Sequence, residues 1–121
     1  MATLVVNSGR AITTNRLKGS GTEPSYSAIG TGAGTAAAAD TTLFTETGSR
    51  VAGTSTQQTT STTNDTYQVV ATHTAGGALA ITNAGLFDAA TVGNLFLKGD
   101  FATVNLANGD SLQLTYKAQY A

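Results

Sequence analysis

The chain has 121 residues and a net charge of −1, and only 11% of its residues are charged, less than half the ~25% usual for a soluble domain. It has no cysteine, one histidine and six scattered Lys and Arg residues, which excludes a disulfide framework or thiolate metal site and argues against nucleic-acid binding. No apolar run approaches the ~20 residues of a membrane span, and no basic start precedes a long apolar stretch, so we expect neither a membrane helix nor a secretory signal.

The N-terminal residues 1–24 predict a short strand and a short helix. Leu4-Val5-Val6 can begin the strand. Ser8 can cap a helix that carries Ile12 and stops at Gly19. The apolar periodicity of this segment is weak, so we expect an N-terminal arm or short helix that adds little to the core of one subunit.

The next segment predicts a strand, a loop and a second short helix. Residues 25–29 form a strand candidate after Pro24, and a glycine-rich loop with four alanines follows. Asp40 can cap one or two helical turns over residues 41–47. Glu46 and Arg50 stand four residues apart, the spacing of a helical ion pair if the turn extends that far.

Leu43 and Phe44 lie between polar and small residues, with Arg50 nearby. One interpretation is a short helix that caps an open end of a sandwich whose core is thin. The other is an inter-subunit anchor, because small domains with little core gain stability by forming oligomers. The sequence leaves both interpretations open.

Residues 54–66 contain no bulky apolar side chain and are rich in threonine. Threonine favours extended backbone, but neither face of a strand here would be apolar. The segment is therefore either an exposed edge strand or a mobile loop. The register of such a polar strand has to be set by a neighbouring strand or by a partner subunit.

The second half of the chain predicts strands throughout. The strand candidates are 66–74, 79–87, 94–98, 103–107 and 111–120. Asn108-Gly109-Asp110 is a turn signal between the last two, so we expect a hairpin there. Six to eight short strands with one or two short helices near the N-terminus indicate a single all-β domain over 1–121. Its body would be a β-sandwich or jelly roll over 25–121.

No motif in the sequence carries a reaction. No long helix with an apolar stripe follows the run Gly30-Thr31-Gly32-Ala33-Gly34, no βαβ unit surrounds it, and it lacks the lysine of a phosphate loop. His73, the only histidine, falls in phase with the apolar residues of its strand and is interpreted as structural. Asp88, Asp100 and Asp110 stand at predicted strand ends, as turn residues do. We therefore expect no catalytic residue, cofactor or metal.

Three stretches carry a resemblance to a known group of proteins. They are Ala28-Ile29-Gly30-Thr31-Gly32 with Asp40-Thr41-Thr42-Leu43 and Arg50; Ile81-Thr82-Asn83-Ala84-Gly85-Leu86-Phe87-Asp88; and Leu95-Phe96-Leu97 with Phe101 and Gly109-Asp110-Ser111-Leu112. In this order they resemble small virion proteins of tailed bacteriophages, including head decoration or cement proteins. The first two also resemble the virion-attaching domains of some tail-fibre proteins, which often carry a charged residue where Asn83 stands.

The resemblance implies a structural protein without an active site, located in the virion after assembly in the bacterial cytoplasm. The first hypothesis is a homo-oligomeric decoration protein that bridges major capsid subunits, with no nucleic-acid or membrane partner. The alternative is a tail, collar or fibre-attachment subunit. The candidate subunit-interface residues are Leu4, Val5, Leu43, Phe44, Arg50, Thr56, Gln58, Thr60 and Thr62, and the candidate fold-defining residues are Gly85, Leu86, Phe87, Gly109 and Asp110.

A third hypothesis, a carbohydrate-binding module or small hydrolase, has less support. Such modules stack exposed aromatic rings on sugars, whereas this chain has no Trp and places Tyr116 and Tyr120 on the apolar face of their strand. The large apolar residues are also unevenly distributed, since 15 of the 24 Leu, Ile, Val and Phe residues follow Tyr67. We therefore expect the C-terminal half to supply the core and the protein to be stable mainly in an assembly.

Overall fold

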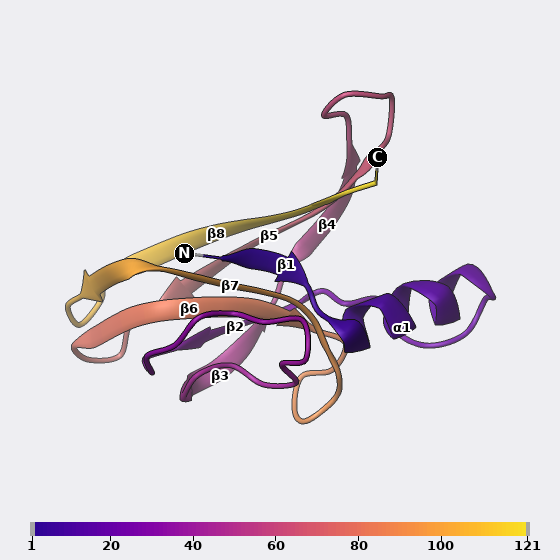
Figure 1. The fold of residues 1–121 in the computed structure, drawn as a ribbon. Helices are drawn as coiled ribbons and strands as arrows, with labels where there is room; N and C mark the ends of the chain where they lie inside the picture. The colour runs from indigo at the N-terminus through magenta and orange to yellow at the C-terminus, as the bar shows by residue number, and fades with distance from the viewer. Residues whose placement is uncertain (1, 121) are drawn as a thin grey trace.

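Two antiparallel sheets packed face to face form the body of the protein in the computed structural model, which describes residues 2–120 (Figure 1). Over those residues the chain makes eight strands and one helix, so the predicted all-β sandwich is confirmed. The larger sheet has the order β1-β7-β6-β2-β3, with β1 Thr3–Val5, β7 Leu95–Leu106, β6 Leu79–Phe87, β2 Tyr26–Gly30 and β3 Glu46–Ala52. The smaller sheet has the order β4-β5-β8, with β4 Thr54–Gln58, β5 Thr66–Thr74 and β8 Ser111–Gln119.

The main core lies between the sheets and follows from the period-two pattern of the strands. Val69 and Ala71 of β5 and Tyr116 and Ala118 of β8 point inward, and their chain neighbours face out. Burying such a strand face against the opposite sheet removes apolar surface from water, the main driving force for folding. The buried members of this cluster are Ile12, Ile29, Val69, Ala75, Ile81, Ala84, Leu86, Phe96, Leu97, Leu106, Tyr116 and Ala118.

The predicted hairpin between the last two strands is wrong. A turn is present, with Gly109 at φ +88°, but it carries the chain from the larger sheet to the smaller one. β8 pairs with β5 over nine residues, whereas β7 pairs with β6 and β1. Turn residues specify that the chain reverses, and they do not specify which strand the next one joins. The connection between β5 and β6 holds this turn in place, because Ala75 O accepts a hydrogen bond from Gly109 N–H at 2.8 Å.

The helix α1 spans Asn7–Leu17 and packs against β7. Its N-cap is Val6, so the prediction that Ser8 caps it is wrong; the Ser8 hydroxyl donates instead to Leu95 O at 2.6 Å. Gly19, at φ +93°, follows the helix end as predicted. Val6 is fully buried and Ile12 is 7% exposed. The expectation that residues 1–24 add little to the core is therefore wrong.

A loop over residues 31–45 covers the outer face of the larger sheet. The helix predicted over 41–47 is wrong, because this segment lies along the sheet and turns directly into β3. Leu43 packs in a second, smaller core on this outer face. The buried members of that core are Val6, Ala28, Leu43, Phe87 and Leu95.

Buried polar side chains of β6 and β7 hold this loop in place. Asn83 accepts from Phe44 N–H and donates to Phe44 O, both at 3.0 Å. Asp100 accepts from Ala36 N–H at 2.7 Å, and this hydrogen bond lowers the pKa of the Asp100 carboxyl. Lys98 donates to Asp40 and to the backbone of the loop. Charged residues in the middle of β7 therefore mark a covered outer face and not a strand end.

Gly85 of β6 lies beneath the loop, against Leu43. A Cβ atom there would lie 2.6 Å from Leu97 O and 2.9 Å from the Leu43 side chain. Leu86 and Phe87, which follow it, are 1% and 2% exposed. Leu86 packs in the main core between the sheets, and Phe87 packs in the smaller core under the loop. At the other end of the molecule, Asp110 accepts from Ala107 N–H at 2.8 Å and closes the turn that enters β8.

Candidate interaction surface

The outward face of the smaller sheet is a continuous polar surface without acidic residues, which we call the Thr/Gln face. Cross-strand register aligns its rows: Thr56 lies opposite Gln68, and Gln68 opposite Lys117. Because partners in an antiparallel pair share a face, these rows run across all three strands. The members are Thr54, Thr56 and Gln58 of β4; Gln68, Val70, Thr72 and Thr74 of β5; and Ser111, Gln113, Thr115, Lys117 and Gln119 of β8.

The composition of the Thr/Gln face sets it apart from an ordinary solvated surface. Among its twelve side chains only Lys117 carries a charge and only Val70 is large and apolar. Soluble domains carry about 25% charged residues overall, and the central parts of protein interfaces are depleted in charge. The Thr and Gln side chains supply hydrogen-bond donors and acceptors without the desolvation cost of ions. The face is therefore suited to contact with another protein surface.

The turn over residues 59–65 borders this face and is organised by one carboxylate. Asp65 accepts backbone hydrogen bonds from Thr60, Ser61 and Thr62, at 2.8, 3.0 and 3.0 Å. The bonds from Thr62 and Thr60 hold the pKa of Asp65 well below its usual range. Gln119 of β8 also donates to Asp65, at 3.1 Å. The turn is therefore a defined extension of the smaller sheet and is tied to β8.

Four of the nine predicted interface residues lie at this border. Thr56 and Gln58 stand on β4, and Thr60 and Thr62 stand in the turn, all of them exposed. The uncertainty over residues 54–66 is thereby resolved: the first five form an edge strand, and the remainder leads through the turn to β5. β5 sets the register of this polar edge within the chain itself.

The other five predicted interface residues are held within the chain. Leu4 and Val5 are half-buried on β1, and Leu43 is buried in the smaller core. Phe44 lies beneath the Lys98 ammonium, which is 3.3 Å from its ring centroid. The Arg50 side chain is only 7% exposed.

Arg50 acts as an internal clamp. Its guanidinium bonds to both carboxylate oxygens of Glu46, donates to the backbone oxygens of Ala89 and Val92, and lies 3.6 Å from the Phe87 ring centroid. The predicted Glu46–Arg50 pair is thus present, although a helix does not create it. A register irregularity in β3 near Gly48, at φ +73°, brings the two residues together.

The sequence interpretation missed the outward residues of β5 and β8 as interface candidates. Their signal was available, because Gln113, Thr115 and Lys117 alternate with the apolar residues of the last strand. What was missing was the sheet order, which places β4, β5 and β8 side by side.

A buried polar cluster joins the two sheets around the single histidine. The Ser27 hydroxyl on β2 lies 2.8 Å from His73 Nε2 and 2.7 Å from the Tyr116 hydroxyl. All three residues are less than 10% exposed, and burial lowers the pKa of His73 and raises that of Tyr116. A serine beside a histidine is the start of a nucleophilic pair, but this one is enclosed in the core and its hydroxyl is shared with Tyr116. The cluster therefore links the sheets.

The His73 cluster leads to a prediction about pH. The pKa of buried His73 is lowered below the 6.5 of the unfolded chain, so the unfolded state binds the proton more readily. The stability contributed by neutral His73 is present above pH 6.5 and is lost as the pH falls toward the folded-state pKa. We expect the melting temperature to drop by a few degrees over this interval. His73→Gln should flatten this part of the profile in calorimetric scans, and an equally steep variant would contradict the assignment.

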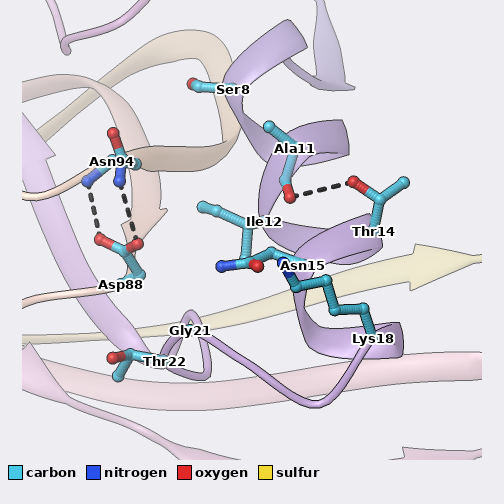
Figure 2. A pocket seen from close by; sticks show the side chains of 10 residues that line it. All are labelled: Ser8, Ala11, Ile12, Thr14, Asn15, Lys18, Gly21, Thr22, Asp88 and Asn94. Carbon is cyan, nitrogen blue, oxygen red and sulfur yellow. Dashed lines mark hydrogen bonds between the residues drawn. The ribbon is translucent and has the colours of Figure 1, made fainter.

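A hollow lined by polar and small side chains lies beside α1 (Figure 2). It measures about 530 Å³ and lies between the helix and the 88–94 loop. Both carboxylate oxygens of Asp88 accept from Asn94, at 2.7 Å from the backbone N–H and 3.2 Å from the side chain. Lys18 at the rim is its one basic side chain. These contacts close the loop and do not prepare Asp88 as a base.

Within residues 2–120, no three His, Cys, Asp or Glu side chains lie close enough to hold a metal ion. The helix of this part of the chain is too short and too polar to cross a membrane. A scan against protein-family models finds no matching family, and searches of curated proteins and of solved structures find no match.

Proposed function

We propose that this chain is a structural virion protein that decorates and stabilises a bacteriophage capsid by bridging major capsid subunits. The observation that carries the proposal is the Thr/Gln face, in which eleven of twelve side chains are uncharged on a three-stranded sheet. The assignment of this surface to a virion rests on the short stretches whose order resembles that of head decoration proteins. No small-molecule chemistry competes for the assignment among the sites described above.

Capsid stabilisation by such a protein follows from mass action. A ligand that binds the assembled shell and not its free subunits lowers the free energy of the shell by its binding free energy. Many copies on a lattice make weak individual contacts effective. A polar face with a single charge supports this mode of binding because it forms hydrogen bonds over a broad area with little need for matched charges on the partner.

Binding to shells tests the proposal. The wild-type chain and the Thr72→Asp variant are mixed with empty shells of the phage that encodes this chain, and occupancy is measured by co-sedimentation. Thr72 is exposed on the central strand of the face. Binding to the shell would bury a carboxylate placed there, so we expect Thr72→Asp to reduce occupancy at least about tenfold. Thr103→Asp, at an exposed position of β7 in the other sheet, is the matched control and should bind normally.

Occupancy that Thr72→Asp leaves unchanged would overturn the role of the face. A deletion of residues 1–10 would not test binding alone, because it would also remove Val6, which is fully buried in the core. Gold-labelled antibody viewed by electron microscopy decides between positions on the virion. Label on the head supports decoration, and label confined to the tail or its fibres supports the alternative, a tail, collar or fibre-attachment subunit.

A further inference from the structure

The four edges of the two sheets differ in how far they are protected against pairing with another chain. β1 has only three residues, and β4 has five and ends in the 59–65 turn. β3 is irregular around Gly48, and Arg50 holds it to the neighbouring loop. Short strands and bulges are the usual means by which proteins keep sheet edges from pairing.

β8 has none of these protections. It is nine residues long, and its register with β5 runs without a shift from Ser111 to Gln119. Its other edge has no strand partner among residues 2–120. It contains no proline or glycine, and Lys117 is its one charged residue. A long, regular edge of this kind is a template for a further strand.

We propose that two copies of this chain pair through β8, antiparallel and about a two-fold axis at Thr115. Thr115 is the central residue of β8, so an axis there lets all nine residues of each strand pair. The two three-stranded sheets then become one six-stranded sheet with a doubled Thr/Gln face. The proposed opposing pairs are Ser111 with Gln119, Leu112 with Ala118, Gln113 with Lys117, Leu114 with Tyr116, and Thr115 with itself.

The occupant is a second copy because β8 is complementary to itself in this register. On the outward side, each Lys117 meets the neutral Gln113 of the other copy, so the two like charges do not face each other. On the inward side, Leu112 and Leu114 are only partly buried within one chain. Ala118 and Tyr116 of the second copy would cover them. A two-fold axis also closes the assembly, whereas head-to-tail joining of β4 to β8 would build open filaments.

The inference goes beyond capsid binding and does not depend on it. A dimer that leaves shells unbound would retain the pairing and overturn the proposed function. Shell binding by a protein that stays monomeric would retain the proposed function and overturn the pairing.

Mass in solution is the first test. Sedimentation of the purified full chain should show a species of twice 12.2 kDa that dissociates on dilution. A monomer at every concentration up to the solubility limit would overturn the pairing.

Charge variants at one position test the surface. Gln113→Glu places a carboxylate opposite Lys117 of the second copy and should tighten the dimer roughly two- to thirtyfold, since symmetry doubles each cross-strand effect. Gln113→Lys should weaken it by a similar factor. Within the chain, position 113 lies beside Thr72 and position 117 beside Gln68, so neither variant pairs charges in the monomer. A dimer that responds equally to both variants would be formed by another surface and would contradict the proposal.

A cysteine variant tests the register. The native chain has no cysteine, and residues directly opposite in an antiparallel pair lie about 4.5–5.5 Å apart at Cα, within disulfide range. Thr115→Cys should give a covalent dimer under mild oxidation. Thr72→Cys, on the central strand of the same face, is the control and should remain monomeric on a reducing-agent-free gel. Equal cross-linking at both positions would exclude an axis at Thr115.

Discussion

Replacing Asp40 with alanine is expected to destabilise the protein by about 3 kcal/mol, the lower end of the range for breaking a buried ion pair. The Asp40 carboxylate lies 2.9 Å from Lys98 Nζ, and the Lys98 side chain is 1% exposed. Without Asp40 this ammonium stays enclosed, with Thr42 O and the Phe44 ring beside it. The value falls at the lower end because the Asp40 side chain is itself 24% exposed. Urea unfolding measures the change.

A double variant separates the ion pair from simple loss of packing. Lys98→Met removes the charge and leaves a flexible apolar chain of similar length in its place. We expect Asp40→Ala combined with Lys98→Met to be more stable than Asp40→Ala alone, because no unpaired charge is then buried. If the double variant is less stable than the single one, the Lys98 ammonium is stabilised mainly by Thr42 and Phe44.

The same lysine shows why part of the fold could not be read from the sequence. Lys98 and Asp100 interrupt an apolar run, and the natural interpretation is that a strand ends there. The structure instead continues β7 through both residues to Leu106. Charges can be buried in the middle of a strand only where another segment pairs with them. That segment, residues 31–45, is a loop whose position no local pattern indicates.

The strands that the sequence predicted correctly are those whose residues alternate between apolar and polar. The alternation in β8 and the run that forms β5 are visible in the sequence because one strand face is buried and the other is wet. The existence of the 108–110 turn was equally clear from Asn108 and Gly109. Which sheet β8 joins depends on contacts with Val69 and other residues some 40 positions away, so the Thr/Gln face appears only once the sheet order is known.

Uneven composition also misled the interpretation of the N-terminal half. Few large apolar residues precede Tyr67, yet several of them occupy structurally central places. Val6, Ile29 and Leu43 are each at most 5% exposed. Small residues such as Gly85 and Ala28 let the loop approach the sheet closely. A small number of large residues is therefore enough to fill the smaller core. The count of apolar residues is therefore a poorer guide than where small residues allow close contact.

Phe87→Ala is expected to cost about 3–5 kcal/mol, the range for truncating a buried phenylalanine. Phe87 is 2% exposed and fills the smaller core with Val6, Leu43 and Leu95. Its loss would leave a cavity under the 31–45 loop. It would also remove the ring on which the Arg50 guanidinium lies. Denaturant unfolding gives the free-energy change.

Phe87→Leu is the matched variant for the ring itself. It keeps most of the apolar volume, so we expect a cost below about 1.5 kcal/mol from repacking, with up to about 2 kcal/mol more if the enclosed cation–π contact contributes fully. A double-mutant cycle with Arg50→Met isolates that second contribution. Coupling near zero would mean that Arg50 stabilises the fold through Glu46, Ala89 and Val92 alone. Measurable coupling would make Phe87 the residue that joins the smaller core to the clamp on β3.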